Sequence, residues 1–114
     1  GGRGGKAYAA EHAGETTVAA LETDSGGFAP RGFAVEAHGD AAARARIEDL
    51  VSLLAPLGAT ALRDDEGGAD IAPLVAAKGL LGLGLWTDGR SYFDIHHTPA
   101  DTVDAAIDVT TALN

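Results

Sequence analysis

Segments with the hydrophobic pattern of helices alternate along this chain with short apolar runs that have the composition of buried strands. The helical patterns cover residues 5–13, 41–55 and 71–79, and a last one runs from Thr102 to about Leu113. The strand-like runs cover residues 16–23, 33–37, 59–63 and 80–86. This alternation favours an α/β fold, a layered sandwich in which helices flank a mostly parallel or mixed sheet.

The helix at residues 41–55 has the clearest pattern. Asp40 precedes it and is a favoured N-cap residue, while Pro56 and Gly58 follow it. An apolar stripe at helical spacing predicts the face that packs on the sheet, and it consists of Ile47, Leu50, Val51 and Leu54. In the strand at 80–86, Gly82 and Gly84 predict close packing between the sheet and a helix.

Composition excludes several classes of function. The 114 residues suffice for one domain with a modest core, so residues 1–114 are interpreted as a single unit. A formal net charge of −9 repels phosphate backbones and argues against nucleic-acid binding. The chain has no cysteine, which excludes disulfides and thiolate metal sites. No apolar run is long enough to span a bilayer.

Two polar segments follow predicted strands. The sequence ETDSG, with Asp24, comes after the first strand, and TDGRSYFDIHHTP, with His96 and His97, comes after the last and is expected to be a long loop. In α/β sheets, ligands collect beyond the carboxyl ends of the strands. We therefore expect the two segments to meet at one edge of the sheet.

The residues alone leave two interpretations of this edge open. Zinc accepts imidazole nitrogens and carboxylate oxygens, so Asp24 and one of the adjacent histidines are candidate ligands. The same side chains are also ordinary loop residues in many proteins, where a loop aspartate caps a turn. Serine hydrolase and phosphate-loop motifs are absent from the sequence.

Four stretches, in order, resemble a known family: GGRGGKAYA, ALETDSGGFAPRGF, GGADIAPL and LWTDGRSYFDIHHTPADT. The family is that of the co-catalytic zinc exopeptidases, which includes leucyl aminopeptidase, aminopeptidase Y and carboxypeptidase Q. The double histidine and the TDSGGFAPRGF form resemble the carboxypeptidase Q branch most. The resemblance implies that residues 1–114 are a partial domain, the C-terminal portion of the catalytic domain.

The resemblance also implies a site with two zinc ions in the complete enzyme. Asp24 matches a ligand of one zinc ion, and His97 matches a ligand of the other. His96, Asp70 and Asp101 are expected to be pocket residues or neighbours of the ligands. The general-base glutamate and the remaining ligands match no segment here, so they are expected upstream of Gly1.

The function implied is that of a zinc-dependent exopeptidase, of aminopeptidase or dipeptidase type, that hydrolyses peptide bonds with a metal-activated water. The expected partners are a peptide or dipeptide substrate and the missing N-terminal half of the enzyme, with homo-oligomer formation also expected. The resemblance implies a secreted or periplasmic location. The alternative is a catalytically inactive fragment or a non-enzymatic α/β interaction module, because two ligands alone hold zinc poorly.

Overall fold

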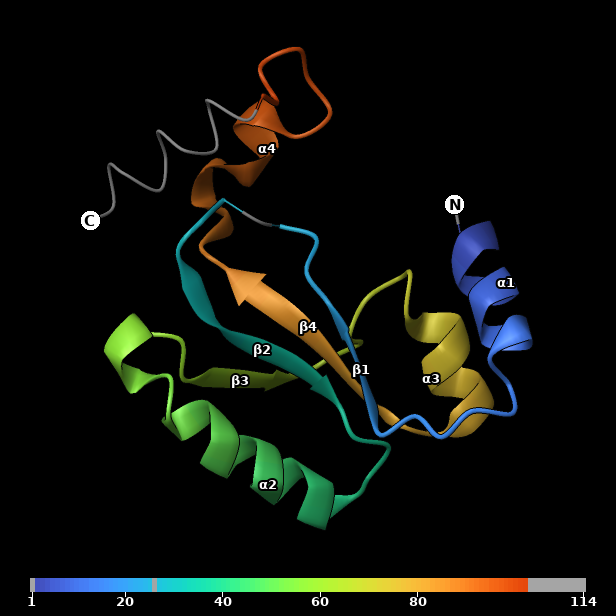
Figure 1. Ribbon diagram of the computed structural model, residues 1–114. Coiled ribbons are helices and arrows are strands. Elements are labelled where there is room, and N and C mark those ends of the chain that lie inside the picture. The colour runs from blue at the N-terminus through green and yellow to red at the C-terminus, as the bar shows by residue number, and fades with distance from the viewer. Residues whose placement is uncertain (1, 26, 103–114) are drawn as a thin grey trace.

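The computed structural model describes residues 2–25 and 27–102 as helices and strands that alternate along the chain (Figure 1). The predicted C-terminal helix lies outside the described residues, apart from Thr102. In chain order the elements are α1 (Arg3–Glu11), β1 (Ala19–Glu22), β2 (Pro30–Glu36), α2 (Ala41–Ser52), η1 (Ala55–Leu57), β3 (Ala61–Asp64), α3 (Ala72–Lys78), β4 (Leu81–Thr87), η2 (Gly89–Ser91) and α4 (Tyr92–Ile95).

The strands form one mixed sheet in the order β1-β4-β2-β3. β1 pairs with β4 in parallel, β2 pairs with β3 in parallel, and β2 pairs with β4 in antiparallel orientation. In the parallel pair, Ala20 lies opposite Gly82. The α/β fold with a mixed sheet flanked by helices is therefore confirmed.

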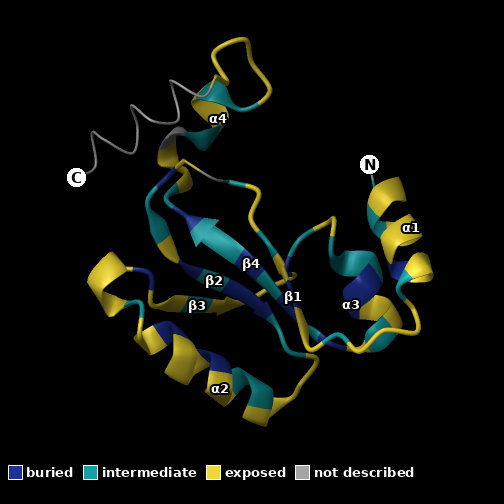
Figure 2. Ribbon diagram, in the orientation of Figure 1, coloured by how far each residue is buried: buried dark blue, intermediate teal, exposed yellow. Residues whose placement is uncertain are grey.

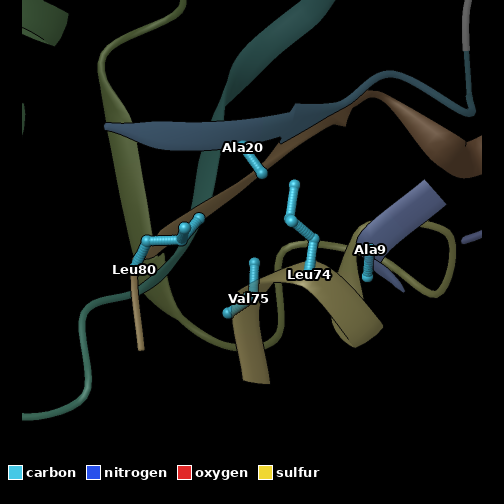
Figure 3. Packing of buried hydrophobic residues seen from close by; sticks show 5 residues of the cluster. All are labelled: Ala9, Ala20, Leu74, Val75 and Leu80. Atoms are coloured by element: carbon cyan, nitrogen blue, oxygen red, sulfur yellow. The ribbon is translucent and has the colours of Figure 1, made fainter. Parts of the chain in front are cut away.

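One hydrophobic cluster joins α3 to the sheet and to α1 (Figure 3). Its buried members are Ala9, Ala20, Leu74, Val75 and Leu80. A Cβ atom added at Gly82 would lie 3.2 Å from Cγ2 of Val75, closer than side chains normally pack. The glycine in β4 thus lets α3 approach the strand backbone, as the sequence predicted.

A second cluster joins α2 to the sheet through Val35, Ile47 and Val51, with Leu81 and Leu83 against it. Leu81 and Leu83 alternate with Gly82, so they face the side of β4 opposite α3. Asp40 caps α2 as predicted, because its Oδ1 accepts a hydrogen bond from the Ala43 amide at 2.9 Å. The sheet is thus covered by helices on both faces.

The predicted stripe of α2 was too wide. Ile47 and Val51 are buried, but Leu50 is 59% exposed, and the side of α2 away from the sheet is exposed along its length (Figure 2). The helix meets the sheet along a narrow line of residues four apart, which leaves Leu50 beside the contact. α2 also ends at Ser52, and Ala55–Leu57 forms the separate turn η1.

The long loop predicted after β4 was wrong. That segment forms η2 and then α4, because Oδ1 of Asp88 accepts a hydrogen bond from the Arg90 amide at 3.3 Å and starts the turn. At the far end, the His96 amide donates to the Tyr92 carbonyl at 2.9 Å. These hydrogen bonds give the histidine segment a fixed backbone.

Candidate functional site

The predicted meeting of two polar segments at one edge follows from the sheet topology. Because β1 and β4 are parallel neighbours, their carboxyl ends lie at the same edge. Asp24 comes shortly after β1, while η2 and α4 follow β4, and α4 lies at this end of the sheet (Figure 1). His96 and His97 directly follow α4 in the chain. In open α/β sheets this edge is where ligands bind.

Tyr92 is one end of a stack of three rings in the second segment, with His96 in the middle. Its ring lies 4.3 Å from the ring of His96, centroid to centroid, and His96 lies 3.7 Å from the ring of His97. The Tyr92 hydroxyl and Nε2 of His96 are 3.4 Å apart, a long hydrogen bond. His97 has a positive φ of 56°, an uncommon conformation for a residue other than glycine.

Tyr92 also connects this segment to the loop after β1. The buried ring of Phe28 meets the Tyr92 ring edge-on, with centroids 6.2 Å apart. Partial burial raises the pKa of Tyr92 above its ordinary value, and the negative charges of Asp24 and Asp101 raise this pKa further. Asp24 and Asp101 therefore lie within electrostatic range of Tyr92, the residue on which His96 stacks. We call Asp24, Tyr92, His96, His97 and Asp101 the Tyr92 cluster.

Asp24 also lines a cavity of about 250 Å³ on the α3 side of the sheet. Glu22, Arg63 and Glu66 line the same cavity, with Gly84 of β4 at its floor. Oε2 of Glu22 accepts hydrogen bonds from the amides of Asp70, at 2.8 Å, and Ile71, at 3.2 Å. The carboxylate of Glu22 thereby fixes the start of α3 against the end of β1.

Asp70 lies near this cavity but is not part of its lining. Asp70 lines a separate cavity of about 430 Å³, together with Gly5, Tyr8 and Leu74. The cavity beside Asp24 is lined instead by the preceding residues, Gly68 and Ala69. The structure thus places Asp70 next to the region of Asp24 but not in the lining of the same cavity.

Tyr92 and Glu22 are neighbours of the candidate site residues that the sequence interpretation missed. Tyr92 and His96 are four residues apart, which is a helical spacing and would have suggested their contact once α4 was recognised. Glu22 and Asp24 are two residues apart, so in an extended chain they project to the same side. Both signals depend on assigning the local backbone correctly.

The exposed side chains of Asp24 and His97 provide donors that zinc accepts, a carboxylate oxygen and an imidazole nitrogen. Within residues 2–25 and 27–102, no three histidine, aspartate or glutamate side chains are placed to hold a metal ion together. A zinc site usually needs three protein ligands and a water, or four protein ligands. The carboxylate of Asp24 and the imidazole of His97 are chemically suited to bind zinc. Further ligands would be needed to complete the coordination of a zinc ion.

Three curated relatives show what the chain is similar to. Carboxypeptidase Q of Rattus norvegicus is 39% identical over 85 residues, which cover 75% of this chain. The Homo sapiens protein of the same name is 37% identical, and that of Xenopus laevis 36%, each over 83 residues or 73% of the chain. The chain spans 17% of the length of each relative.

These similarities support a family link between the chain and carboxypeptidase Q. The resemblance to leucyl aminopeptidase and aminopeptidase Y stays a prediction. No family model and no solved structure matches the chain. Among the described residues, no helix has the length and apolar character needed to cross a membrane.

Proposed function

We propose that this chain is part of a zinc-dependent exopeptidase related to carboxypeptidase Q, and that Asp24 and His97 are two of its metal ligands. The observation that supports the proposal is that Asp24 follows β1 and His97 follows β4 by way of α4, so both predicted ligands come after the carboxyl ends of two neighbouring parallel strands. The similarity to carboxypeptidase Q over about three quarters of the chain supports the same proposal.

Each ligand would act through a defined atom. A carboxylate oxygen of Asp24 and a ring nitrogen of His97 would bind different zinc ions of one pair. When bound, two zinc ions supply a water of lowered pKa and stabilise the charge that develops on the reacting oxygens. The glutamate that accepts the proton of that water is proposed to lie in another part of the protein.

The other members of the Tyr92 cluster would position the ligands. Tyr92 stacks on His96 and His96 stacks on His97, so the three rings support one another. The Tyr92 hydroxyl is a hydrogen-bond donor, and partial burial together with the charges of Asp24 and Asp101 raises its pKa further above neutral pH. The positive φ of His97 is a strained local conformation of the kind found at functional sites.

The substrate we propose is a short peptide or a dipeptide. The relatives are named as carboxypeptidases, enzymes that release a residue from the carboxyl end. A dipeptide meets that requirement, and Asp24 lines a cavity of about 250 Å³.

The test is peptidase activity and zinc content in the whole gene product that carries this sequence. We expect His97→Ala to abolish activity and to lower the bound zinc, whereas His12→Ala, on a histidine that pairs with Glu15, should leave both unchanged. Full activity in the His97→Ala protein would refute the assignment of this ligand. Full zinc content with no activity would point to a role in catalysis without metal binding.

A further inference from the structure

Asp88, at the end of β4, holds two arginine side chains from separate parts of the chain. Its carboxylate is 7% exposed and accepts a hydrogen bond from Nη2 of Arg31. It also accepts from Nε of Arg90 at 2.8 Å and from Nη2 of Arg90 at 2.6 Å. One negative charge thus faces two positive charges, and the group has a net charge of +1.

The two guanidinium groups keep free donors. The Arg31 side chain is 48% exposed and that of Arg90 is 76% exposed. Each guanidinium carries five N–H donors, and Asp88 takes up only some of them. The chain as a whole has a net charge of −9, but this group of side chains is positively charged. It is therefore suited to bind an anion.

Both arginines line one cavity of about 500 Å³, together with Thr60, Trp86 and Gly89. This volume lies within the ~300–1,000 Å³ typical of small-molecule sites. Trp86 gives the cavity an apolar wall, so its lining combines a fixed cationic end with an aromatic surface. Paired guanidinium groups bind carboxylates with good geometry because their donors form planar forks.

Two hydrogen bonds and the chain itself connect the lining of this cavity to the segments that carry the Tyr92 cluster. The Asp88 amide donates to the Ala29 carbonyl at 2.8 Å, and Thr87 Oγ1 donates to the Ser25 carbonyl at 3.3 Å. These hydrogen bonds connect the end of β4 to the loop that contains Asp24. Arg90 in turn lies in η2, which leads directly into α4 and Tyr92.

We propose that Arg31 and Arg90, held in place by Asp88, bind the free α-carboxylate of a peptide substrate. An exopeptidase must recognise a free chain end, and of the two ends only the carboxyl end is an anion. The identity of the ligand as a peptide rests on the proposed function, whereas the binding of a carboxylate by this cavity does not require metal or catalysis.

Trp86, the single tryptophan of the chain, lines the cavity and reports on binding through its fluorescence. The 114-residue chain is titrated with glycyl-leucine, with glycyl-leucinamide and with acetate. We expect the free dipeptide to give a saturable fluorescence change, with affinity at least tenfold weaker for the amide. We expect acetate, which lacks the rest of the peptide, to bind at least tenfold more weakly than the dipeptide.

Variants assign the effect to the two arginines. Arg90→Gln and Arg31→Gln should each weaken dipeptide binding at least tenfold, while Arg46→Gln, on exposed α2, should leave it unchanged. Circular dichroism checks that each variant folds. If Arg31→Gln does not fold, Arg90→Gln alone carries the test. Equal affinity for the dipeptide and its amide, or unchanged binding by Arg90→Gln, would overturn the proposal. Such a result would leave the metal ligands Asp24 and His97 untouched, since their test measures zinc.

Discussion

The phenol ring of Tyr92 stacks on the imidazole of His96, with ring centroids 4.3 Å apart and planes inclined by 23°. Phe28, from the loop after β1, contacts the Tyr92 ring edge-on. Tyr92 thus joins the two polar segments that follow β1 and β4. Its removal should affect both the stability of this edge and the placement of the histidines.

Tyr92→Ala should lower the free energy of unfolding by about 2 kcal/mol, less than the ~3–5 kcal/mol typical of a fully buried aromatic residue, because Tyr92 is only half-buried. Tyr92→Phe keeps the ring and loses only a long hydrogen bond, so its loss should stay below about 1 kcal/mol. Urea unfolding of the two variants measures both values. Equal losses in the two proteins would show that the ring contacts do not stabilise the edge.

Asp88 should make stability depend on acidity. The guanidinium groups of Arg90 and Arg31 hold the pKa of its carboxyl well below its ordinary value. A depressed folded-state pKa gives stability that is present above the unfolded pKa, about 3.9, and is lost as the pH falls below it. The melting temperature of the wild type should therefore drop toward that of Asp88→Asn between pH 5 and pH 2.

The matched control for this experiment is Asp49→Asn, on the exposed side of α2. Its melting temperature should follow that of the wild type over the same pH range. If the difference between wild type and Asp88→Asn stays constant from pH 5 to pH 2, the paired arginines do not stabilise the charged form of Asp88.

Gly84→Ala should destabilise the sheet. A Cβ at this position of β4 would overlap the carbonyl oxygen of Gly67, so one backbone segment must move. We expect a loss of about 2–3 kcal/mol, the upper range for overpacked sites. Gly4→Ala, in α1 with no atom within 4 Å of the new Cβ, should instead gain about 0.5 kcal/mol. Thermal unfolding measures the stability of both variants. A Gly84→Ala protein as stable as the wild type would contradict the close packing.

The outer edge of β1 should promote self-association of the isolated chain. Among the described strands, β1 is at the edge of the sheet and pairs with β4 alone. Leu21 of this strand is 53% exposed, and unpaired apolar edges are sites of association. Light scattering should detect dimers or larger species, and Leu21→Lys should reduce them, whereas Leu53→Lys, at the end of α2, should not. A monomeric wild type would contradict this expectation.

Elements that depend on local signals were predicted well from the sequence. Asp40 and the glycine-rich β4 are examples, because a capping side chain and a missing Cβ act on nearby backbone. The shared edge for Asp24 and the histidines also followed from the alternation of helices and strands, through the parallel pairing of β1 and β4.

Features that depend on tertiary contacts were not predictable. The helix α4 is only four residues long, too short to give a helical pattern in the sequence. It follows the turn η2, whose first residue is capped by Asp88, a residue that also pairs with the distant Arg31. Leu50 has a helical core pattern, but its exposure depends on how α2 meets the sheet. The role of Tyr92 could not be assigned before Phe28 and His96 were known to surround it.

The central claim is that Asp24 and His97 are zinc donors at one edge of the sheet, and zinc titration of the 114-residue chain followed by NMR tests it most directly. The account predicts weak binding that shifts the His97 ring resonances, is lost in His97→Ala and persists in His12→Ala. Shifts at the Asp24 side chain are expected to be lost in Asp24→Asn. Zinc binding that is unchanged in Asp24→Asn and His97→Ala, or that shifts only the His12 and His38 rings, would contradict the account.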